Sequence, residues 1–284
     1  MNVQAACVRC SIICRVRISE TKQFFPAVRA CLNESDPAAK CEMTSRLWQR
    51  VSKNELSHTD CGQAGSTNSP GRPEKPQLVP PAMVPRRRLG NPRGRAALIH
   101  AIAHIEFNAI NLALDAACRF AEMPPAYYRD WASVAADEAR HYSMLNERLV
   151  ELGFAYGDFP AHDGLWEMAV KTRHSCLERM ALVPRVLEAR GLDVTPGMIS
   201  RLDAAGDTQT VSVLEVILRE EVRHVEIGTR WFRHCCALEG KEPSQEFLRL
   251  LDEHFNGSLR GPFNVAARRQ AGFSDVEMEA ISTT

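Results

Sequence analysis

Two five-residue stretches decide the fold predicted for this chain: Asp137-Glu138-Ala139-Arg140-His141 and Glu220-Glu221-Val222-Arg223-His224. Each has an acidic residue, then Glu, one unmatched position, Arg and His. Residues i and i+3 share one face of a helix, so the Glu and the His of each stretch can reach one metal ion. Heptad spacing places both pairs in apolar stripes, where buried ionisable groups need a compensating charge. The repeat therefore predicts two helices that supply ligands to one metal centre.

The two stretches lie in the second and fourth of four long segments that have helical periodicity. We predict helices over about 95–123, 125–152, 164–190 and 207–238, ended by Pro124, Gly153, Gly191 and Gly240. No strand pattern competes with them. The predicted fold is therefore all-α, with a four-helix bundle over residues 95–240.

The remaining segments are predicted to be accessory to this bundle. Residues 1–20 are expected to form a disordered leader, and 21–60 to form accessory helices, one of which opens at Asp36-Pro37. Seven prolines between Pro70 and Pro92 exclude helix, so 61–94 is predicted to be a Pro-rich linker or an arm laid along the bundle. Residues 241–284 are expected to be a C-terminal helical extension, with short helices near 243–255 and 262–282.

Composition indicates a soluble protein. The 35 basic residues balance the 35 acidic ones, so no global field would draw the chain to nucleic acid or to an anionic membrane. The most apolar segments carry Glu, His or Arg at short intervals, which argues against a membrane-spanning helix. Met1–Arg17 lacks the pattern of a secretory signal.

We expect a cytoplasmic protein whose helical cysteines are reduced thiols. Cys7, Cys10 and Cys14 lack the clustered second half of a zinc site, and no role is predicted for them.

A two-metal bundle site of this kind needs one further Glu from each of the other two helices. Glu106 lies on an apolar line of the first helix, at about the same height as the Glu-x-x-His pairs. Glu167, Glu178 and Glu188 compete on the third helix. Glu178 lies near its middle, whereas the other two would miss the metals by roughly 15 Å. The predicted ligands are Glu106, Glu138, His141, Glu178, Glu221 and His224.

Polar residues next to these ligands are expected to steady them through hydrogen bonds or ion pairs. They are His104, Asp137, Arg140, His174, Glu220 and Arg223. For His104 and His174, an ordinary core or surface role fits equally well.

The arrangement of one Glu, Glu-x-x-His, one Glu and a second Glu-x-x-His resembles the ferritin-like di-iron carboxylate superfamily over roughly half the chain. The resemblance implies that Glu106 and His141 bind one metal and that Glu178 and His224 bind the other. In the same way, it implies that Glu138 and Glu221 bridge the two.

Shorter motifs are similar to an uncharacterised bacterial ferritin-like family, known only as a domain of unknown function. This likeness extends from about residue 26 to the end, and the first 20 residues depart from it. More distantly, Cys176-Leu177-Glu178-Arg179 resembles a third-helix motif of tRNA-modifying di-iron hydroxylases. The motifs that carry the closer likeness are Pro70-Gly71-Arg72-Pro73, Gly94-Arg95-Ala96-Ala97, His104-Ile105-Glu106 and Pro262-Phe263-Asn264.

Carboxylates and imidazoles without a thiolate suit iron or manganese. The set predicts an oxygen-dependent monooxygenase that holds two iron ions and acts with an unidentified electron donor. Two alternatives keep the same ligands: a ferritin-like protein that oxidises and stores iron, and a di-manganese catalase. Storage needs a hollow shell of many subunits, for which the long extensions are ill-suited, so a monomer or dimer is favoured.

The substrate is predicted to be a small molecule or a modified nucleoside. A basic cluster before the first helix offers a surface for tRNA, but it lacks the stacking aromatics expected of readers of single-stranded RNA. A nucleic-acid partner is therefore not favoured. The cluster comprises Arg86, Arg87, Arg88, Arg93 and Arg95.

Overall fold

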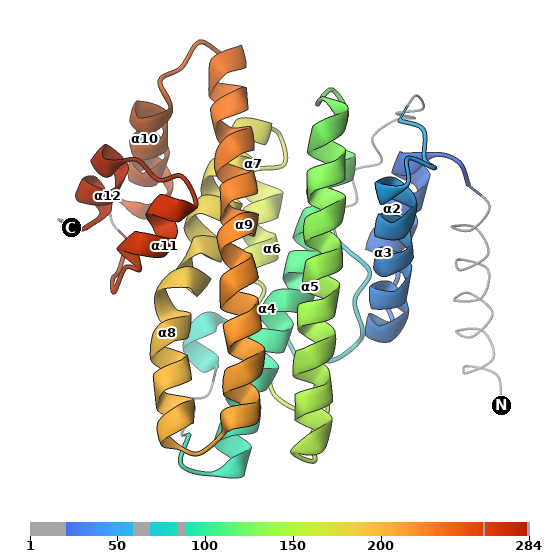
Figure 1. Cartoon of the computed structure of the whole chain (residues 1–284), viewed down its shortest axis with the longest axis vertical. Helices are drawn as coiled ribbons and strands as arrows, with labels where there is room; N and C mark the ends of the chain where they lie inside the picture. Colours follow the sequence, from blue (N-terminus) through green and yellow to red (C-terminus); the bar gives the residue numbers. More distant parts are fainter. Residues whose placement is uncertain (1–20, 59–68, 85–88, 258, 283–284) are drawn as a thin grey trace. The chain divides into compact units, whose positions relative to one another are not determined.

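The computed structural model describes residues 21–58, 69–84, 89–257 and 259–282. Within these residues the regular structure is helical, and β pairing is limited to two isolated bridges. The predicted all-α class is confirmed. The described residues fall into two compact units, one formed by residues up to 84 together with 92–163, and one by 89–91 together with 164–282 (Figure 1).

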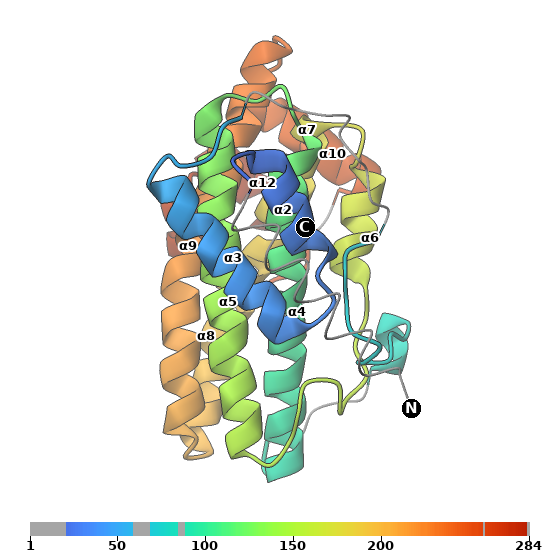
Figure 2. The same ribbon diagram turned by 90° about the vertical axis from the view of Figure 1, so that its right-hand side faces the viewer.

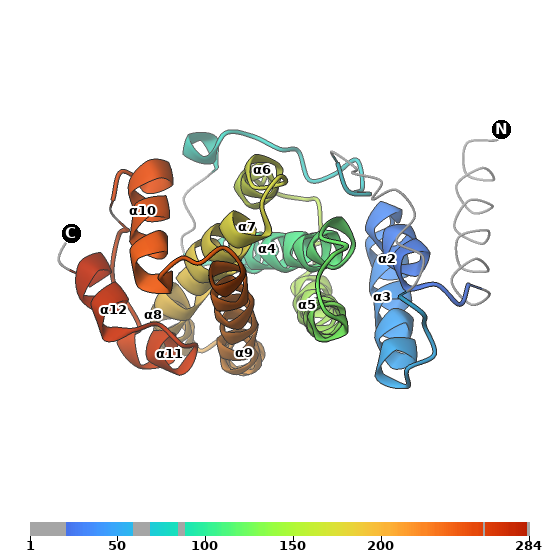
Figure 3. The ribbon, with the colours of Figure 1, turned by 90° about the horizontal axis from the view of Figure 1, so that it is seen from above.

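The first unit is built on two long helices, α4 (Pro92–Arg119) and α5 (Pro125–Glu151), which pack along each other. Helix α4 ends at Arg119, before its predicted end at about 123, so the prolines are not what ends it, whereas Pro125 begins α5 as predicted, in a first turn that suits proline. The shorter helices α2 (Phe24–Asn33) and α3 (Pro37–Ser52) pack on α4 and α5 respectively. Figure 3 shows them as a layer beside the α4–α5 pair. The predicted opening of a helix at Asp36-Pro37 is confirmed, since Asp36 Oδ1 accepts from Ala39 N at 2.8 Å.

Helix α4 is the apolar centre of this unit. It is the one helix among the described residues that is long and apolar enough to cross a membrane. However, 83% of its apolar window is buried inside the protein. Such burial is typical of a helix in a protein core.

The described part of the Pro-rich segment, 69–84, is an arm that lies against the first unit. Gly71 N donates to Leu32 O at 2.8 Å, and Val79 N donates to Ala161 O at 2.8 Å. A Cβ at position 71 would overlap the carbonyl oxygens of Asn33 and Glu34, so this close approach requires glycine. The described residues 69–84 therefore run along the first unit. Figure 2 shows α3 crossing α5 obliquely on the same unit.

The second unit contains α6 (Gly164–Lys171), α7 (Cys176–Leu182), a π-helical turn η2 (Val183–Glu188), α8 (Ala189–Ala204) and α9 (Thr208–Leu238). The prediction of α9 is confirmed to within one residue at its start. Its N-cap is Asp207, whose Oδ1 accepts from Thr210 N at 3.2 Å. The C-terminal helices α10 (Pro243–Phe255), α11 (Val265–Gln270) and α12 (Asp275–Ser282) pack on this unit.

The prediction of one unbroken third helix over 164–190 is wrong. The chain turns at Thr172, whose hydroxyl donates back to Met168 O at 2.8 Å, and the helix restarts with Ser175 as N-cap. A π turn then accommodates Pro184, which has no N–H to donate. Gly191 does not end the helix. Its φ is not positive, so it does not adopt the left-handed conformation of a helix C-cap, and α8 continues through it.

Helix α8 instead continues through Pro196 to Ala204. A proline at this position cannot donate to Leu192 O, four residues earlier. That carbonyl is satisfied by the Asn264 side chain, whose Nδ2 donates to Leu192 O at 3.2 Å. A contact from 72 residues away therefore lets the helix pass a residue that would otherwise break it.

Candidate metal centre

The first unit brings three predicted ligands together. Glu106 projects from α4, and Glu138 and His141 project from adjacent turns of α5. His141 Nδ1 lies 3.3 Å from Glu106 Oε2 and 3.3 Å from Glu138 Oε2. One ligand atom from each of the three lies within 4.8 Å of the others, and all three residues are buried. This group can hold a metal ion.

The position of these residues follows from the helix pattern. The stripe of α5 that carries Trp131, Val134 and Leu145 is buried, as its heptad spacing predicts. Glu138 and His141 interrupt that stripe and are 1% and 0% exposed. Two ionisable groups are thus held in an apolar face, where they must compensate each other or bind an ion.

Electrostatics inside the group favour a cation. Burial disfavours a charged imidazole, but the hydrogen bonds to Glu106 and Glu138 outweigh it and raise the pKa of His141 to about 11. The protonated ring therefore serves as the positive charge between two carboxylates when no ion is bound. Because a metal ligand must be a neutral imidazole, a divalent cation would take the place of that proton.

The second unit repeats this pairing on α9. Glu221 and His224 are 8% and 0% exposed, and His224 Nδ1 lies 3.2 Å from Glu221 Oε1. Their stripe is buried at Leu214, Ile217 and Trp231, as predicted from heptad spacing. Each unit therefore contains one buried Glu-x-x-His pair of nearly the same geometry.

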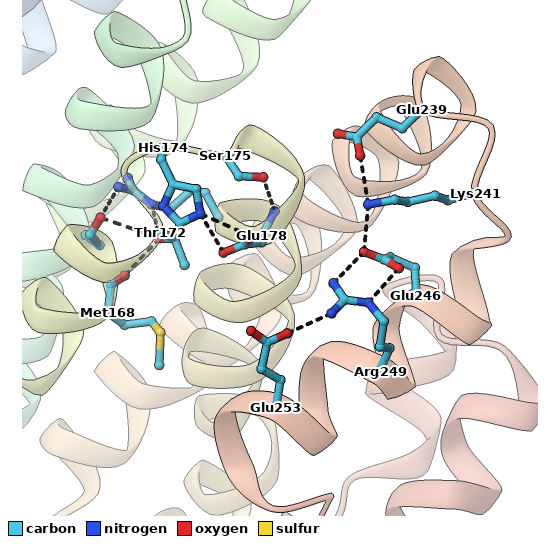
Figure 4. Close-up of polar contacts among 12 residues, drawn as sticks. Met168, Thr172, His174, Ser175, Glu178, Glu239, Lys241, Glu246, Arg249 and Glu253 are labelled. Atoms are coloured by element: carbon cyan, nitrogen blue, oxygen red, sulfur yellow. Dashed lines mark hydrogen bonds and ion pairs between the residues drawn. The ribbon is translucent and has the colours of Figure 1, made fainter.

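Glu178 has a different environment among the contacts described. Its carboxylate lies 3.2 Å from Nε2 of His174, whose side chain is 63% exposed (Figure 4). Its backbone N–H donates to the Ser175 cap at 3.2 Å. The structure thus pairs Glu178 with His174, the neighbour predicted to steady it, and its role as a ligand remains a prediction.

The other predicted supporting residues separate into two groups. Asp137 and Arg140 form an ion pair with each other at 3.0 Å on the outer side of α5. On α9, Glu220 is half-buried and Arg223 is exposed. A role for these four in steadying the ligands remains a prediction.

His104 takes part in a different network. It lies two residues from Glu106, about 200° around α4. Its ring contacts Tyr156 Oη at 2.8 Å, His162 O at 3.2 Å and Asn108 Nδ2 at 3.0 Å. Sequence reasoning missed Asn108 and Tyr156, because neither carries a recognisable motif.

Lys40 is a second buried group that the sequence did not indicate. It is 0% exposed, and its Nζ donates to Leu32 O at 2.9 Å and to Asn111 Oδ1 at 2.5 Å. Burial lowers the pKa of Lys40 to about 7. The lysine joins the end of α2 to α4 and takes no part in the carboxylate group.

Comparison with known proteins shows the family. The model of a family described as "Protein of unknown function (DUF455)" matches residues 33–279. A Haemophilus influenzae protein described as uncharacterized is 42% identical over 269 residues, which cover 91% of this chain and 93% of that protein. No solved structure matches. The extent of the family match agrees with the resemblance expected from about residue 26 to the end. With most of its length matched, the chain belongs to the DUF455 family.

Proposed function

We propose that the two Glu-x-x-His helices contribute to one centre of the ferritin-like di-iron kind. In this proposal Glu106 and His141 bind one ion, Glu178 and His224 bind the other, and Glu138 and Glu221 bridge them. The buried group of Glu106, Glu138 and His141 is the observation that carries it. Oxygen and nitrogen ligands without thiolate favour iron, with manganese as the alternative metal.

The chain would then act as an oxygen-dependent monooxygenase on a small molecule or a modified nucleoside. Two ferrous ions would supply the electrons that activate dioxygen for insertion into a C–H bond. The side chains of α4, α5, α7 and α9 would hold the ions. A separate electron donor would return the centre to its reduced state, and a monomer or dimer in the cytoplasm is proposed. The free thiols of the described cysteines fit a reducing compartment.

Metal analysis and oxygen uptake test this proposal directly. We expect protein reconstituted with ferrous iron under anaerobic conditions to retain about two irons per chain, and to consume dioxygen when air is admitted. Glu138→Gln should lose most of the bound iron, because it removes a bridging carboxylate. Glu147→Gln is the matched control, since it changes an exposed carboxylate further along the same helix and outside the group, and it should retain the metal. Iron and manganese contents well below two per chain would contradict the proposal.

The two alternatives give different results in the same experiments. Iron storage requires a particle of dozens of subunits, which light scattering would detect. A catalase would disproportionate hydrogen peroxide when loaded with manganese and would show no substrate-dependent oxygen uptake.

A further inference from the structure

Helices α8 and α9 of the second unit form an antiparallel hairpin. Only residues 205–207 separate them, and they pack along each other (Figure 1). The π turn η2 runs directly into α8 and also packs on α9. In an antiparallel hairpin, residues that are equally far from the turn lie at the same level. One contact across the pair therefore shows which residue of η2 is level with the Glu-x-x-His pair of α9.

A contact between Pro184 and Gly228 fixes this register. A Cβ on Gly228 would overlap the ring of Pro184, so η2 and α9 approach closely at this point. The turn of the hairpin gives the same alignment, because Ala204 ends α8 and Thr208 begins α9. Pro184 is 20 residues before Ala204, and Gly228 is 20 residues after Thr208. The contact and the turn therefore agree on one register.

This register places Glu188 level with His224. Glu188 follows Pro184 by four residues, and His224 precedes Gly228 by four. Residues four apart are offset by only about 40° around a helix, and by no more than that in a π turn. Glu188 therefore lies on the face that η2 turns to α9, and His224 on the face that α9 turns to η2. Oε2 of Glu188 is buried, as is the imidazole of His224.

Glu178 meets neither condition. It precedes Pro184 by six residues, so it is turned about 120° from the proline around the helix. It is ten residues before Glu188, which puts it about 15 Å along the helix axis from the level of His224. Its carboxylate instead lies 3.2 Å from His174 at the surface (Figure 4). The prediction of Glu178 assumed an unbroken helix over 164–190, which the structure shows to be broken.

The first unit has the same hairpin arrangement around its own Glu-x-x-His pair. Glu106 on α4 meets His141 on α5, and the two are 35 residues apart in the chain. Glu188 and His224 are 36 residues apart, whereas Glu178 and His224 are 46 apart. A short turn between two helices brings residues to one level only when they are about equally far from it. The spacing of Glu188 therefore repeats that of Glu106.

We propose that Glu188, and not Glu178, is the third-helix carboxylate that binds the same metal ion as His224. The inference rests on the proposed function and replaces one of its six ligands. With Glu221, it gives the second unit two carboxylates and one imidazole, which is the donor set of the first unit. Such donors suit iron or manganese. Glu178 then serves as the surface partner of His174.

Metal analysis of the full-length protein, reconstituted anaerobically with ferrous iron, tests this inference. Wild type and Glu178→Gln should each hold about two irons per chain, and Glu188→Gln about one. Glu188→Gln combined with His224→Ala should also hold about one, because both residues bind the same ion. Full iron content in Glu188→Gln, or iron loss in Glu178→Gln alone, would overturn the assignment. Wild type without iron or manganese would instead contradict the proposed function, and no variant is needed to see it.

Thermal melting separates the loss of a ligand from damage to the fold. Metal-free Glu188→Gln and Glu178→Gln should melt within a few degrees of metal-free wild type, because each exchange keeps the size of the side chain. Ferrous iron should raise the melting temperature of wild type and Glu178→Gln equally, and that of Glu188→Gln by less, since a ligand stabilises the state that binds it. Glu188→Asp, which keeps the charge, should hold more iron than Glu188→Gln. Equal iron loss in these two variants, together with a large drop in melting without metal, would show a structural role and overturn the assignment.

Discussion

Glu106 Oε2 and His141 Nδ1 lie 3.3 Å apart, although 35 residues separate them in the chain. The two side chains meet because α4 and α5 pack along each other with their apolar stripes in contact. Glu138 completes the group from the same helix as His141. The closeness of three ionisable side chains within one compact unit is the basis for the first prediction.

Metal stoichiometry should report which ligands share an ion. If Glu106 and His141 bind the same ion, Glu106→Ala, His141→Ala and the double variant should each retain about one iron per chain. Adding His224→Ala to His141→Ala should remove both ions. Elemental analysis after removal of loosely bound metal measures these ratios. A double variant of Glu106 and His141 with half the iron of either single variant would contradict the assignment.

The buried Lys40 should make stability depend on pH. Its pKa is about 7 in the folded protein and about 10.4 in an unfolded chain, so above pH 7 the unfolded state binds more protons. The Lys40 contribution to the free energy of unfolding should therefore rise by up to about 1.4 kcal/mol per pH unit above pH 7. Above about pH 8.5 the buried thiols reverse the trend, because Cys31 and Cys118 have pKa values raised to about 12 by burial.

The measurement is urea unfolding of wild type and Lys40→Met between pH 7 and 8.5. His141, whose pKa is raised, makes the free energy of unfolding of metal-free protein fall as pH rises. The quantity to compare is therefore the free energy of unfolding of wild type minus that of Lys40→Met, from which the His141 contribution cancels. This difference in the free energy of unfolding should increase as pH rises from 7 to 8.5. A difference that stays constant with pH would show that Lys40 does not titrate in this range.

The buried ion pair between Arg185 and Glu277 should be costly to break. The two side chains are 2.8 Å apart, and the guanidinium lies 4.1–4.8 Å from the ring centroids of Phe232, Phe247 and Phe273. Glu277→Gln leaves a buried guanidinium without its counter-charge, so it should lower the free energy of unfolding by about 3–5 kcal/mol. Replacing both partners, as in Arg185→Met with Glu277→Leu, should recover most of that loss.

A surface network in the same unit provides the control. Arg249 bridges Glu246 and Glu253 at 2.7–2.8 Å on α10, and its side chain is 52% exposed (Figure 4). Arg249→Met should change stability by less than about 1 kcal/mol, because exposed ion pairs contribute little. Chemical denaturation of the three proteins would reveal the contrast. Similar losses for Glu277→Gln and Arg249→Met would rule out the proposed cost of the buried charge.

Two glycines in helices should respond to alanine in opposite directions. A Cβ on Gly228 would overlap the ring of Pro184 in the π turn, so Gly228→Ala should destabilise the protein by about 1–3 kcal/mol. Gly191 has open space around it within a continuous helical stretch, so Gly191→Ala should stabilise by about 0.5–1 kcal/mol. The melting temperature of Gly228→Ala should be lower than that of wild type, and that of Gly191→Ala should be higher. Stabilisation by Gly228→Ala would show that the contact with Pro184 is loose.

Local signals explain why much of the secondary structure was predictable. Pro125 and Asp207 mark the starts of α5 and α9 through their effects on the first turn, and heptad spacing marks the buried faces. The burial of Glu138, His141, Glu221 and His224 follows from the same periodicity. These features depend on hydrogen bonds and side-chain directions within a few residues, so a sequence pattern is enough to predict them.

The third helix shows where local signals fail. Gly191 is a common stop signal, yet α8 passes it because no residue there needs a left-handed conformation. Pro196 is a helix breaker, yet Asn264 satisfies the carbonyl that it leaves without a donor. The π turn at Pro184 fits only because Gly228 on α9 leaves room for its ring. The outcomes at Pro196 and Pro184 each depend on a residue far along the chain.

The sequence by itself determined that the chain is helical and that two Glu-x-x-His pairs are buried, because the 3.6-residue period relates spacing directly to a helix face. Only the tertiary structure decided that Glu106 meets His141, that His104 turns away from them, and that Lys40 is enclosed. Contacts of this kind depend on which segments cover a side chain. That covering comes from long-range packing, which no short stretch of sequence encodes.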